Sequence, residues 1–404
     1  MPKKQLGKHR ERLLELGNDA LQRKMASPLI ALTANSLWNI VNFRSALIES
    51  FASMGYRVVV LAPEGAHAET LLQRGISLAP LRIDNKGQSP LRDIGLIRQY
   101  RRELRRLAPA ALLSFTIKPN IYGSLAAASL GIPVINNISG LGTAFISGGW
   151  LEKLVELLYR AALRRSSTVF FQNRDDQALF VERGLISPGQ AQLLNGSGVD
   201  LDAFTPRPTG KQTGICYLLV GRLLWDKGVG EFVEAARIVR QTLPESRFQL
   251  LGAIGADNRT AVGRASVEGW VSEGLIDYLG ELEDVRPCLA AADCVVLPSY
   301  REGLPRSLIE AAAMGRPAIA TDVPGCRAAI DDQVTGYLCE PRSGAALAEA
   351  MIRFAKLDES ARTTMGVKAR AKAVREFDEK AVVAAYYSSL ARAGVISMST
   401  GQKS

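Results

Sequence analysis

The feature that most constrains the fold is a regular alternation of short β-branched runs with longer amphipathic windows. The runs predict strands at residues 29–34, 56–63, 111–116, 133–139, 167–173, 215–221, 247–253, 276–280, 293–299 and 317–322. The windows between them carry apolar residues three and four apart, which is typical of helices packed on one face. Strand and helix in strict alternation predict an α/β architecture with parallel sheets covered by helices on both faces.

The length of 404 residues exceeds what one hydrophobic core usually supports, so two domains are expected. A polar segment rich in Pro, Gly and Thr interrupts the alternation and is interpreted as a linker. The predicted divisions are a basic N-terminal extension (1–26), a first domain (27–201), the linker (202–214), a second domain (215–375) and a C-terminal helix packing back on the first domain (376–395). We therefore expect two doubly wound, Rossmann-like domains facing a central cleft, with ligands at the carboxyl ends of the strands.

Cysteine usage and the N-terminus indicate the compartment. The chain has five cysteines, Cys216, Cys288, Cys294, Cys326 and Cys339, without a CxxC pair, which predicts reduced thiols in a cytoplasmic protein. The first residues are basic but lack an apolar core, so no signal peptide is expected. No window reaches the roughly 18 consecutive apolar residues of a spanning helix, so we expect no membrane crossing.

The excess of positive over negative charge lies entirely in the first half of the chain. Residues 1–200 hold 25 Lys and Arg against 15 Asp and Glu, whereas residues 201–404 hold 25 against 25. A one-sided basic field favours an anionic partner such as nucleic acid, an acidic lipid surface or a phosphate-bearing substrate. Nucleic acid is not expected, because basic residues interleaved with aromatic ones and a reading helix are both missing.

The stretch SYREGLPRSLIEAAAMG places two glutamates around a predicted helix start. Pro305 suits the first helical turn, so we expect a helix from Pro305 through Met314. The free N–H groups at its start form an anion site, and Glu302 beside them is placed to accept hydrogen bonds from sugar hydroxyls. Glu310 is predicted to face the cleft and take ribose hydroxyls, because AAAMG adds no polar group that would make a charged face. The alternative is an acidic residue before the helix and a solvated glutamate within it.

The stretch GRLLWDKG carries two cations at the opening of another helix. Arg222 and Lys227 lie five residues apart beside Gly221 and Gly228. Two cations at a helix N-terminus suit a diphosphate group. The alternative interpretation is an ordinary surface loop with two basic residues.

Together these motifs carry a resemblance to a known family. GRLLWDKG, then ELEDVRPCLAAADCVVLPS, then REGLPRSLIEAAAMGRPAIATD resembles the nucleotide-sugar domain of retaining glycosyltransferases of family 4, whose two-domain architecture is called GT-B. Glu302 and Glu310 match that family's paired glutamates, which are separated by seven residues. The similarity runs in order from residue 29 to about residue 390.

The resemblance implies a role for each matching position. Arg222 and Lys227 would bind the donor diphosphate and stabilise the leaving group. Glu302 would hold sugar hydroxyls and Glu310 the ribose. The remaining implied donor contacts are the backbone N–H groups of Gly303 and Leu304, for sugar and phosphate, and the stretch Gly280, Glu281, Leu282 with Val285, for the base.

Residues 114–146 resemble the matching stretch of glycosyltransferases that act on undecaprenyl-diphosphate-linked saccharides for bacterial surface polysaccharides or protein glycans. Many family 4 members have a histidine after this strand, where this chain has Ile117 and Lys118. That departure makes Lys118 the candidate for a polar contact at the reaction centre; the alternative is a lysine facing water. Candidate acceptor contacts are Asn120, Gly140 and Gly142. His9 and His67 lie outside any motif, so a histidine base is not expected.

Two amphipathic segments predict contact with a membrane surface. One carries an apolar stripe of Trp150, Leu151, Leu154, Leu158 and Ala161, and the other carries Arg98, Arg101, Arg102, Arg105 and Arg106. Helices with an apolar stripe and basic flanks can lie on an anionic bilayer. The alternative is a stripe packed in the core with a solvated basic face.

The sequence thus predicts a retaining glycosyltransferase that moves a sugar, from a UDP-hexose or UDP-N-acetylhexosamine, to a lipid-linked saccharide at the inner face of the cytoplasmic membrane. The resemblance implies front-face attack with the leaving phosphate accepting the proton, and neither a cofactor nor a metal is expected. Asp200 and Asp202 spell a DxD metal motif, but they fall at the domain junction. Three alternatives stay open: a soluble acceptor, a non-catalytic nucleotide-sugar-binding module, and a nicotinamide oxidoreductase, which would need GxGxxG where this chain has TANSLWNIVNF.

Overall fold

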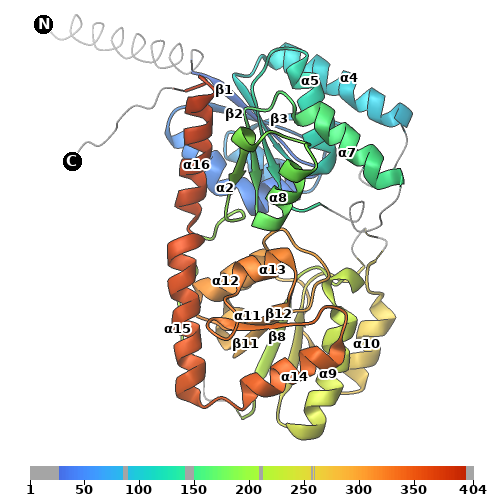
Figure 1. Cartoon of the computed structure of the whole chain (residues 1–404), viewed down its shortest axis with the longest axis vertical. Coiled ribbons are helices and arrows are strands. Elements are labelled where there is room, and N and C mark those ends of the chain that lie inside the picture. The colour runs from blue at the N-terminus through green and yellow to red at the C-terminus, as the bar shows by residue number, and fades with distance from the viewer. Residues whose placement is uncertain are drawn as a thin grey trace, which may run out of the picture.

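The computed structural model describes residues 27–84, 90–141, 150–208, 213–255, 258 and 260–396. Two parallel sheets lie one above the other along the long axis of the molecule, each flanked by helices (Figure 1). The predicted α/β class with two doubly wound sheets is confirmed. The predicted extension at 1–26 and part of the predicted linker lie outside the described residues.

The first sheet has seven parallel strands in the order β3-β2-β1-β4-β5-β6-β7. They are β1 (Leu29–Thr33), β2 (Arg57–Ala62), β3 (Ser77–Pro80), β4 (Ala111–Phe115), β5 (Val134–Ile138), β6 (Thr168–Phe171) and β7 (Ala191–Leu193). Every residue of β4, β5 and β6 is buried, as expected for strands covered on both faces. The edge strands β3 and β7 escaped the sequence analysis, because they are short and only partly buried.

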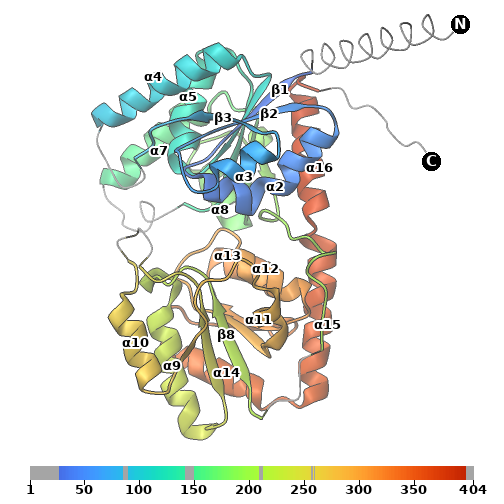
Figure 2. The ribbon, with the colours of Figure 1, turned by 180° about the vertical axis from the view of Figure 1, so that it is seen from behind.

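Helices cover both faces of this sheet. They are α2 (Leu37–Ser53), α3 (Ala68–Gln73), α4 (Pro90–Leu107), α5 (Ser124–Ala128), α7 (Trp150–Leu163) and α8 (Arg174–Glu182), with a π-helical turn η1 (Pro119–Gly123) before α5 and a short 3-10 turn η2 (Pro188–Gln190). Tyr100 of α4 and Tyr159 of α7 pack into the core on one face. Phe51 of α2 packs into the core on the other. Figure 2 shows α2 and α3 on the side away from α4 and α7.

The second sheet has six parallel strands in the order β10-β9-β8-β11-β12-β13. They are β8 (Cys216–Val220), β9 (Arg247–Leu251), β10 (Asp277–Tyr278), β11 (Cys294–Leu297), β12 (Ala318–Thr321) and β13 (Gly336–Cys339). The edge strand β13 was also missed from sequence. The flanking elements are η3 (Trp225–Lys227), α9 (Val229–Thr242), α10 (Arg264–Ser272), α11 (Arg286–Ala291), α12 (Arg306–Ala313), α13 (Pro324–Ala329) and α14 (Gly344–Ala355).

Two consecutive C-terminal helices connect the halves of the molecule. α15 (Glu359–Glu376) lies against α12 of the second domain, and α16 (Glu379–Arg392) lies against α2 of the first (Figure 1). Tyr386 of α16 is fully buried and contacts Phe115 and Phe170 of the first sheet. The chain therefore returns to its first domain at the end, and α16 contributes to that domain's core.

The strand orders locate the ligand-binding region. In the first sheet the order reverses between β1 and β4, and in the second between β8 and β11. Loops diverge to opposite faces at such a point and leave a crevice at the carboxyl ends of the strands. Within the described ranges every helix is too short or too polar to cross a lipid bilayer.

Candidate functional site

The loop after β8 carries the two predicted phosphate-binding cations. Arg222 follows the strand directly and is exposed to solvent, and Lys227 ends the short helix η3. Gly228 then takes a left-handed backbone (φ 74°), and a Cβ there would lie 2.1 Å from the Pro298 carbonyl oxygen. Only glycine fits this close approach. The turn therefore brings Lys227 against the loop that follows β11.

Backbone hydrogen bonds fasten the two loops together. The Asp226 carbonyl accepts from the Tyr300 N–H (3.0 Å) and from the Ser299 hydroxyl (3.2 Å). The Lys227 ammonium consequently forms an ion pair with the Glu302 carboxylate. The side chain of Glu302 is 11% exposed, so solvent screens this pair only partly. The predicted diphosphate cation and the predicted sugar-binding carboxylate are therefore in direct contact.

A cysteine thiol lies near this pair. Burial raises the pKa of Cys326, and the negative charge of Glu302 raises it further while Lys227 lowers it. A thiol with a raised pKa is a poor nucleophile at neutral pH. The reactive groups at this position are therefore a carboxylate and an ammonium group, not a thiolate.

The loop of Glu302 is also hydrogen-bonded to the first domain. The Asn173 side chain donates to the Gly303 carbonyl (2.9 Å), and the Leu304 N–H donates to the Gln172 side chain (3.1 Å). A Cβ on Gly303 would lie 2.1 Å from the Ser139 carbonyl oxygen, so the two backbones are in contact. The Leu304 N–H, which the resemblance assigned to the donor, is used by the first domain in this arrangement.

Gly140 faces the same loop from the first domain. Its backbone is left-handed (φ 141°), and a Cβ there would lie 3.6 Å from the Gly303 nitrogen. A close approach at this glycine was expected from an acceptor phosphate or the donor; the approach that the structure shows is by the other domain. The companion residue Gly142 lies outside the described residues.

The first domain contributes a strained turn after β4. Thr116 has a left-handed backbone (φ 67°), which is unfavourable for a β-branched residue, and its hydroxyl accepts from the Asn35 N–H. The π-helical turn η1 follows at once. Backbone strain and π-turns gather at functional sites, which marks this end of β4 as part of one.

Lys118 lies on this turn and is held by a carboxylate. Its ammonium is 2.7 Å from Asp93 Oδ1, and Tyr122 donates to Asp93 Oδ2 at 2.7 Å. Burial raises the pKa of Tyr122, and the hydrogen bond to Asp93 raises it further. The Lys118 side chain is 18% exposed, so the alternative of a lysine facing water is wrong. Asp93 was missed from sequence, because it lies on α4, far from any motif.

Asn120 belongs to a buried amide network. It is 1% exposed, its Nδ2 donates to the Asn137 carbonyl (2.9 Å), and its Oδ1 accepts from Asn136 (3.0 Å). Both ends of the amide are thus used inside the first domain. An amide with satisfied hydrogen bonds is held in place by its neighbours, and the acceptor contact of Asn120 stays a prediction.

Glu310 is placed differently from expectation. It is 8% exposed, and its Oε1 accepts from Arg306 Nε, one turn earlier on α12, at 2.5 Å. The argument that no other polar group shares its helix face is wrong, since Arg306 shares it. The helix begins at Arg306 with Pro305 as its N-cap residue and ends at Ala313, one residue inside each predicted end. Burial raises the pKa of Glu310, and Arg306 lowers it.

A cavity of about 530 Å³ lies between the two switch points. It is lined from the second domain by Arg222, Lys227, Glu302 and Gly303 and from the first by Lys118, Asn120 and Gly140, among the sequence-predicted residues. Residues that sequence analysis missed also line it, including Asn35, Tyr300, Arg301 and Arg342. Arg301 is the first residue of the REGLP motif and Tyr300 precedes it, so their position after β11 was a usable signal.

The remaining predicted donor residues do not line this cavity. They are Gly280, Glu281, Leu282, Val285, Leu304 and Glu310. Gly280 follows β10, and its carbonyl accepts from Gly252 after β9. The stretch predicted for the base thus lies at the carboxyl edge of the same sheet, beyond the cavity.

The DxD sequence serves a local structural purpose. Asp200 Oδ1 accepts from the backbone N–H groups of Asp202 and Ala203, and Asp202 pairs with Lys380 at 3.0 Å. Neither carboxylate lines the cavity. Among the described residues no group of three or more His, Cys, Asp or Glu side chains is arranged to hold a metal ion.

Two family models match this chain, one on each domain. The family described as glycosyl transferase 4-like domain matches residues 42–196, and glycosyl transferases group 1 matches residues 215–356. The first match spans β2 to β7 of the first sheet, and the second spans all six strands of the second sheet.

Curated relatives include enzymes with lipid-linked substrates. The chain is 26% identical to an N,N'-diacetylbacillosaminyl-diphospho-undecaprenol alpha-1,3-N-acetylgalactosaminyltransferase of Campylobacter jejuni, over 86% of this chain and 94% of that protein. It is 25% identical to a UDP-Gal:alpha-D-GlcNAc-diphosphoundecaprenol alpha-1,3-galactosyltransferase of Escherichia coli, over 65% of this chain and 70% of that protein.

Solved structures share the architecture at low identity. A glycosyltransferase of Rickettsia africae has a TM-score of 0.73 at 15% identity, covering 92% of this chain and 100% of that one. An Anabaena protein in complex with UDP and glucose has a TM-score of 0.72 at 18% identity, covering 90% and 99%. Two sheets facing a cleft, with one family match on each, make this chain a member of the GT-B glycosyltransferases built from a glycosyl transferase 4-like domain and a glycosyl transferases group 1 domain.

Proposed function

We propose that this protein is a retaining glycosyltransferase that moves a hexose or N-acetylhexosamine from a UDP-sugar to a lipid-linked saccharide, in the assembly of a bacterial surface polysaccharide or glycan. The observation that carries the proposal is the Lys227–Glu302 ion pair at the mouth of the cavity, with Arg222 on the same loop and the strained Thr116 turn opposite. The relatives that act on undecaprenyl-diphosphate-linked sugars support the acceptor class.

The donor would meet complementary charges along the second domain. Lys227, held by Glu302, and the exposed Arg222 are the cations for the diphosphate, and they would stabilise the negative charge that grows on the leaving group. Glu302, held by Lys227, offers its carboxylate to sugar hydroxyls. We keep Glu310 as the ribose contact of the proposal; the ribose would then share that carboxylate with Arg306.

The acceptor would approach from the first domain. Lys118 and the Gly140 backbone line the cavity on that side, so an acceptor hydroxyl placed there would face the donor across the gap between the domains. We propose front-face attack with retention, in which the departing phosphate takes the hydroxyl proton and no side chain is needed as base. Excluding water from the closed cavity would favour transfer over hydrolysis.

Peripheral contact with an anionic membrane is part of the proposal. On α7 the side chains of Leu154 and Leu157 are 42% and 60% exposed, although Val155 and Leu158 of the same helix pack against the core. On α4 the predicted arginines, Arg98, Arg101, Arg102, Arg105 and Arg106, are all exposed. Figures 1 and 2 both show α4 and α7 on one side of the first domain, with α5 packed against each. An apolar stripe beside a basic helix suits a lipid surface, where the acceptor's lipid tail would be.

The test is release of nucleoside diphosphate from a panel of nucleotide sugars in the presence of bacterial membranes. We expect release with a UDP-sugar that rises when lipid extract is added. Glu302→Ala and Lys227→Ala should each lower kcat by about two orders of magnitude or more, because each removes a charge at the reacting centre. Glu281→Ala, at the edge of the sheet, should change KM for the donor more than kcat.

Two results would count against the proposal. No release from any sugar nucleotide would remove the assigned activity. Full activity in both the Glu302→Ala and Lys227→Ala variants would place the chemistry elsewhere. Retention is checked separately, by the anomeric proton coupling of the isolated product in NMR spectra, and an inverted product would overturn that part alone.

A further inference from the structure

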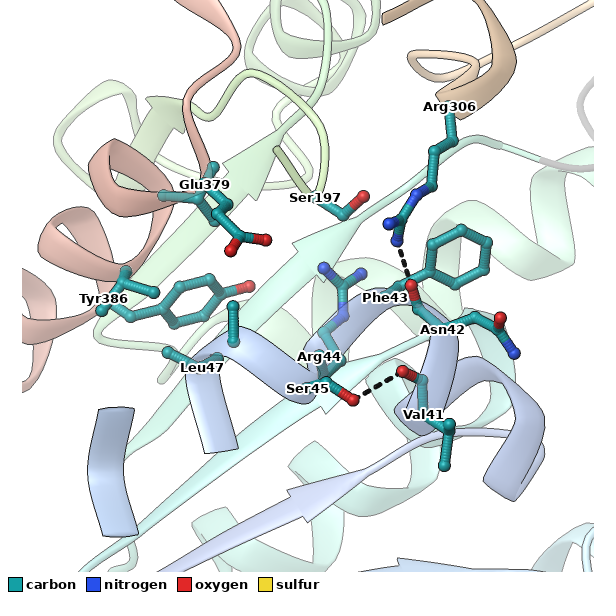
Figure 3. A pocket seen from close by; sticks show the side chains of 13 residues that line it. Val41, Asn42, Phe43, Arg44, Ser45, Leu47, Ser197, Arg306, Glu379 and Tyr386 are labelled. Atoms are coloured by element: carbon teal, nitrogen blue, oxygen red, sulfur yellow. Dashed lines mark hydrogen bonds between the residues drawn. The ribbon is translucent and has the colours of Figure 1, made fainter. Parts of the chain in front are cut away.

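A second, smaller cavity lies apart from the Lys227–Glu302 pair. Its volume is about 110 Å³, and it is enclosed by residues 41–47 of α2, the first turns of α16, the segment at Ser197, and Arg306 of the second domain (Figure 3). None of the residues assigned above to donor or acceptor lines it. Its walls come from both domains, so a ligand there would contact both.

Arg44 of α2 is the unusual residue of this cavity. It is 4% exposed, and among the described residues it makes no hydrogen bond or ion pair; its Nε is buried without any acceptor. Its recorded contact is with the face of the Phe115 ring, 4.1 Å from the centroid. Burial lowers the pKa of the Arg44 guanidinium, yet an arginine stays protonated in proteins. A buried cation without an acceptor is strongly unfavourable, so an anionic partner is to be expected.

A second guanidinium reaches the same cavity from the other domain. Arg306 extends from the start of α12, pairs with Glu310, and also donates to the Asn42 carbonyl of α2. Figure 3 shows the guanidinium groups of Arg306 and Arg44 and the hydroxyl of Ser197 around the cavity. Two cations and a hydroxyl supply hydrogen-bond donors from three directions.

A carboxyl group, Glu379, also borders the cavity. Burial raises its pKa, and Asp200 raises it further, while Arg306 lowers it. Asp378 and Glu49 add negative charge in the surroundings. Glu379 thus takes up a proton more easily than an exposed glutamate does, and a protonated carboxyl group donates a hydrogen bond to an anion.

We propose that this cavity binds one phosphoryl-sized anion, held by Arg44 from the first domain and by Arg306 from the second. Planar guanidinium groups match the oxygens of a phosphate, and this fit explains a buried arginine with no protein acceptor. The volume equals that of about three or four water molecules, which suits a tetrahedral anion and excludes a nucleotide. The anion is either free phosphate or the terminal phosphate of a lipid diphosphate.

The experiment separates this site from the diphosphate cations of the cleft. In an Arg222→Ala/Lys227→Ala background, titration calorimetry with inorganic phosphate should still show one bound phosphate. Adding Arg44→Gln should weaken that binding by about tenfold or more, because hydrogen bonds to a charged group are lost. In phosphate-free buffer Arg44→Gln should keep or raise Tm, since it removes an unpaired buried charge, and it should abolish the rise in Tm that phosphate causes.

Arg316→Gln is the matched control. Arg316 is likewise buried (8% exposed), but it donates to the backbone carbonyls of Ala290 and Arg207. Its replacement should lower Tm in both buffers and leave the phosphate-induced rise intact. Glu379→Gln tests the sign of the charge on the bound ion. Removing this carboxylate should tighten the binding of phosphate, whereas it should weaken binding at a site for a cation.

The source of the anion is decided by comparing inorganic phosphate with a polyprenyl diphosphate in detergent micelles. Arg44-dependent binding of phosphate alone assigns free phosphate, and Arg44-dependent binding of the lipid assigns its head group. The proposal is overturned if the double-variant background binds neither, if Arg44→Gln leaves binding unchanged, or if Arg44→Gln lowers Tm equally with and without phosphate. The last result would mean that the cavity holds only water and that Arg44 is structural.

Discussion

Two of the cations that line the cleft are paired with carboxylates, whereas Arg222 is exposed to solvent. Lys227 is paired with Glu302, and Lys118 with Asp93. An ion pair restricts both partners to few rotamers, so each group is already oriented when a ligand arrives. The same cations then need little reorganisation to meet a phosphate or a hydroxyl. The site therefore contains these two ion pairs, whose members come from the loops after β4, β8 and β11 and from α4.

Asn120 provides the first test at this scale. We expect Asn120→Ala to lower the free energy of unfolding by about 2–4 kcal/mol, because the Asn137 carbonyl and the Asn136 amide each lose a hydrogen bond in the core. Urea denaturation measures the change. Asn42→Ala, at an exposed amide, is the control and should stay within about 0.5 kcal/mol of the unmodified protein. An Asn120→Ala variant of full stability but raised acceptor KM would support the predicted acceptor contact.

The raised pKa of Glu310 can be tested by measuring how stability depends on pH. Burial raises its pKa above the ordinary 4.5, so the folded state holds the proton more tightly than the unfolded state. Its stabilising contribution is therefore complete below pH 4.5 and is lost as pH rises through the folded-state pKa. Glu310→Gln cannot ionise, and its stability relative to the unmodified protein should increase as pH rises from about 4 toward neutrality. Urea denaturation at a series of pH values follows the difference.

Asp284 is the control, because its pKa is shifted in the opposite direction from that of Glu310. The hydrogen bond from Arg286 lowers its pKa, so its contribution is present above its ordinary value of 3.8 and is lost as pH falls. Asp284→Asn should lose stability near neutrality and approach the unmodified protein in acid. A Glu310→Gln variant whose difference from the unmodified protein does not change with pH would show that Arg306 cancels the effect of burial on the pKa of Glu310, and a difference that changes in the opposite direction would show that Arg306 outweighs burial.

At the scale of elements, α7 shows how one helix can serve two environments. Tyr159, Ala162 and Leu163 pack in the core, while Leu154 and Leu157 lie in solvent on another side of the helix. The predicted stripe is only partly packed in the core: Leu154 is exposed, whereas Leu158 packs against the core, so the alternative offered for the stripe holds for Leu158. Its first two members, Trp150 and Leu151, have side chains outside the described residues. A helix with apolar residues on two sides needs a second apolar partner, and the proposal assigns that role to lipid.

We expect the double variant Leu154→Gln/Leu157→Gln to bind vesicles of anionic lipid at least about tenfold more weakly, because two apolar side chains no longer enter the interface. Co-sedimentation with vesicles measures the change. Val367→Gln/Val374→Gln is the matched control: these residues are 63% and 51% exposed on α15 of the second domain. If the two double variants bind vesicles equally, α7 is not the contact. Stability should be unchanged in both, since all four side chains are exposed.

Across the whole molecule, the two domains are hydrogen-bonded to each other through the loop that carries Glu302. Gly303 and Leu304 hydrogen-bond to Asn173 and Gln172 of the first domain. The position of Gly303, next to Glu302, therefore depends on the position of the first domain. Any rotation of one domain against the other breaks these contacts, so the geometry around Glu302 depends on the domain arrangement.

Arg301 tests this tie between the domains. Its guanidinium pairs at 2.5 Å with Asp176 of the first domain, a carboxylate that is 1% exposed, whereas Arg301 itself is 26% exposed. Arg301→Ala should lower stability by about 2 kcal/mol, because the carboxylate stays buried without its cation. Small-angle scattering should show a larger radius of gyration. Arg237→Ala removes a half-exposed pair within the second domain and should change neither quantity measurably. Unchanged scattering in Arg301→Ala would mean that other contacts suffice.

Much of the site could be predicted from local sequence. Arg222, Lys227 and Glu302 lie in the segments that follow β8 and β11, and the ends of parallel strands that flank a switch point meet in space. Lys118 could be placed near the cleft on the same ground. Its partner Asp93 could not, because an ion pair between a helix and a distant loop leaves no periodic pattern in the chain.

Local sequence was enough to predict the α/β class, the two sheets and the central strands, because burial on both faces requires continuous apolar runs. Which charges meet depends on the folded arrangement of segments that are distant in the chain. Arg306 shares a helix face with Glu310 by spacing alone, yet whether they pair depends on the burial that the first domain and the rest of the second impose. Likewise Asn120 lies at the cleft, but its side chain is buried and its hydrogen bonds are made inside the first domain. The spacing of strands along the chain does not encode which groups come within hydrogen-bonding distance.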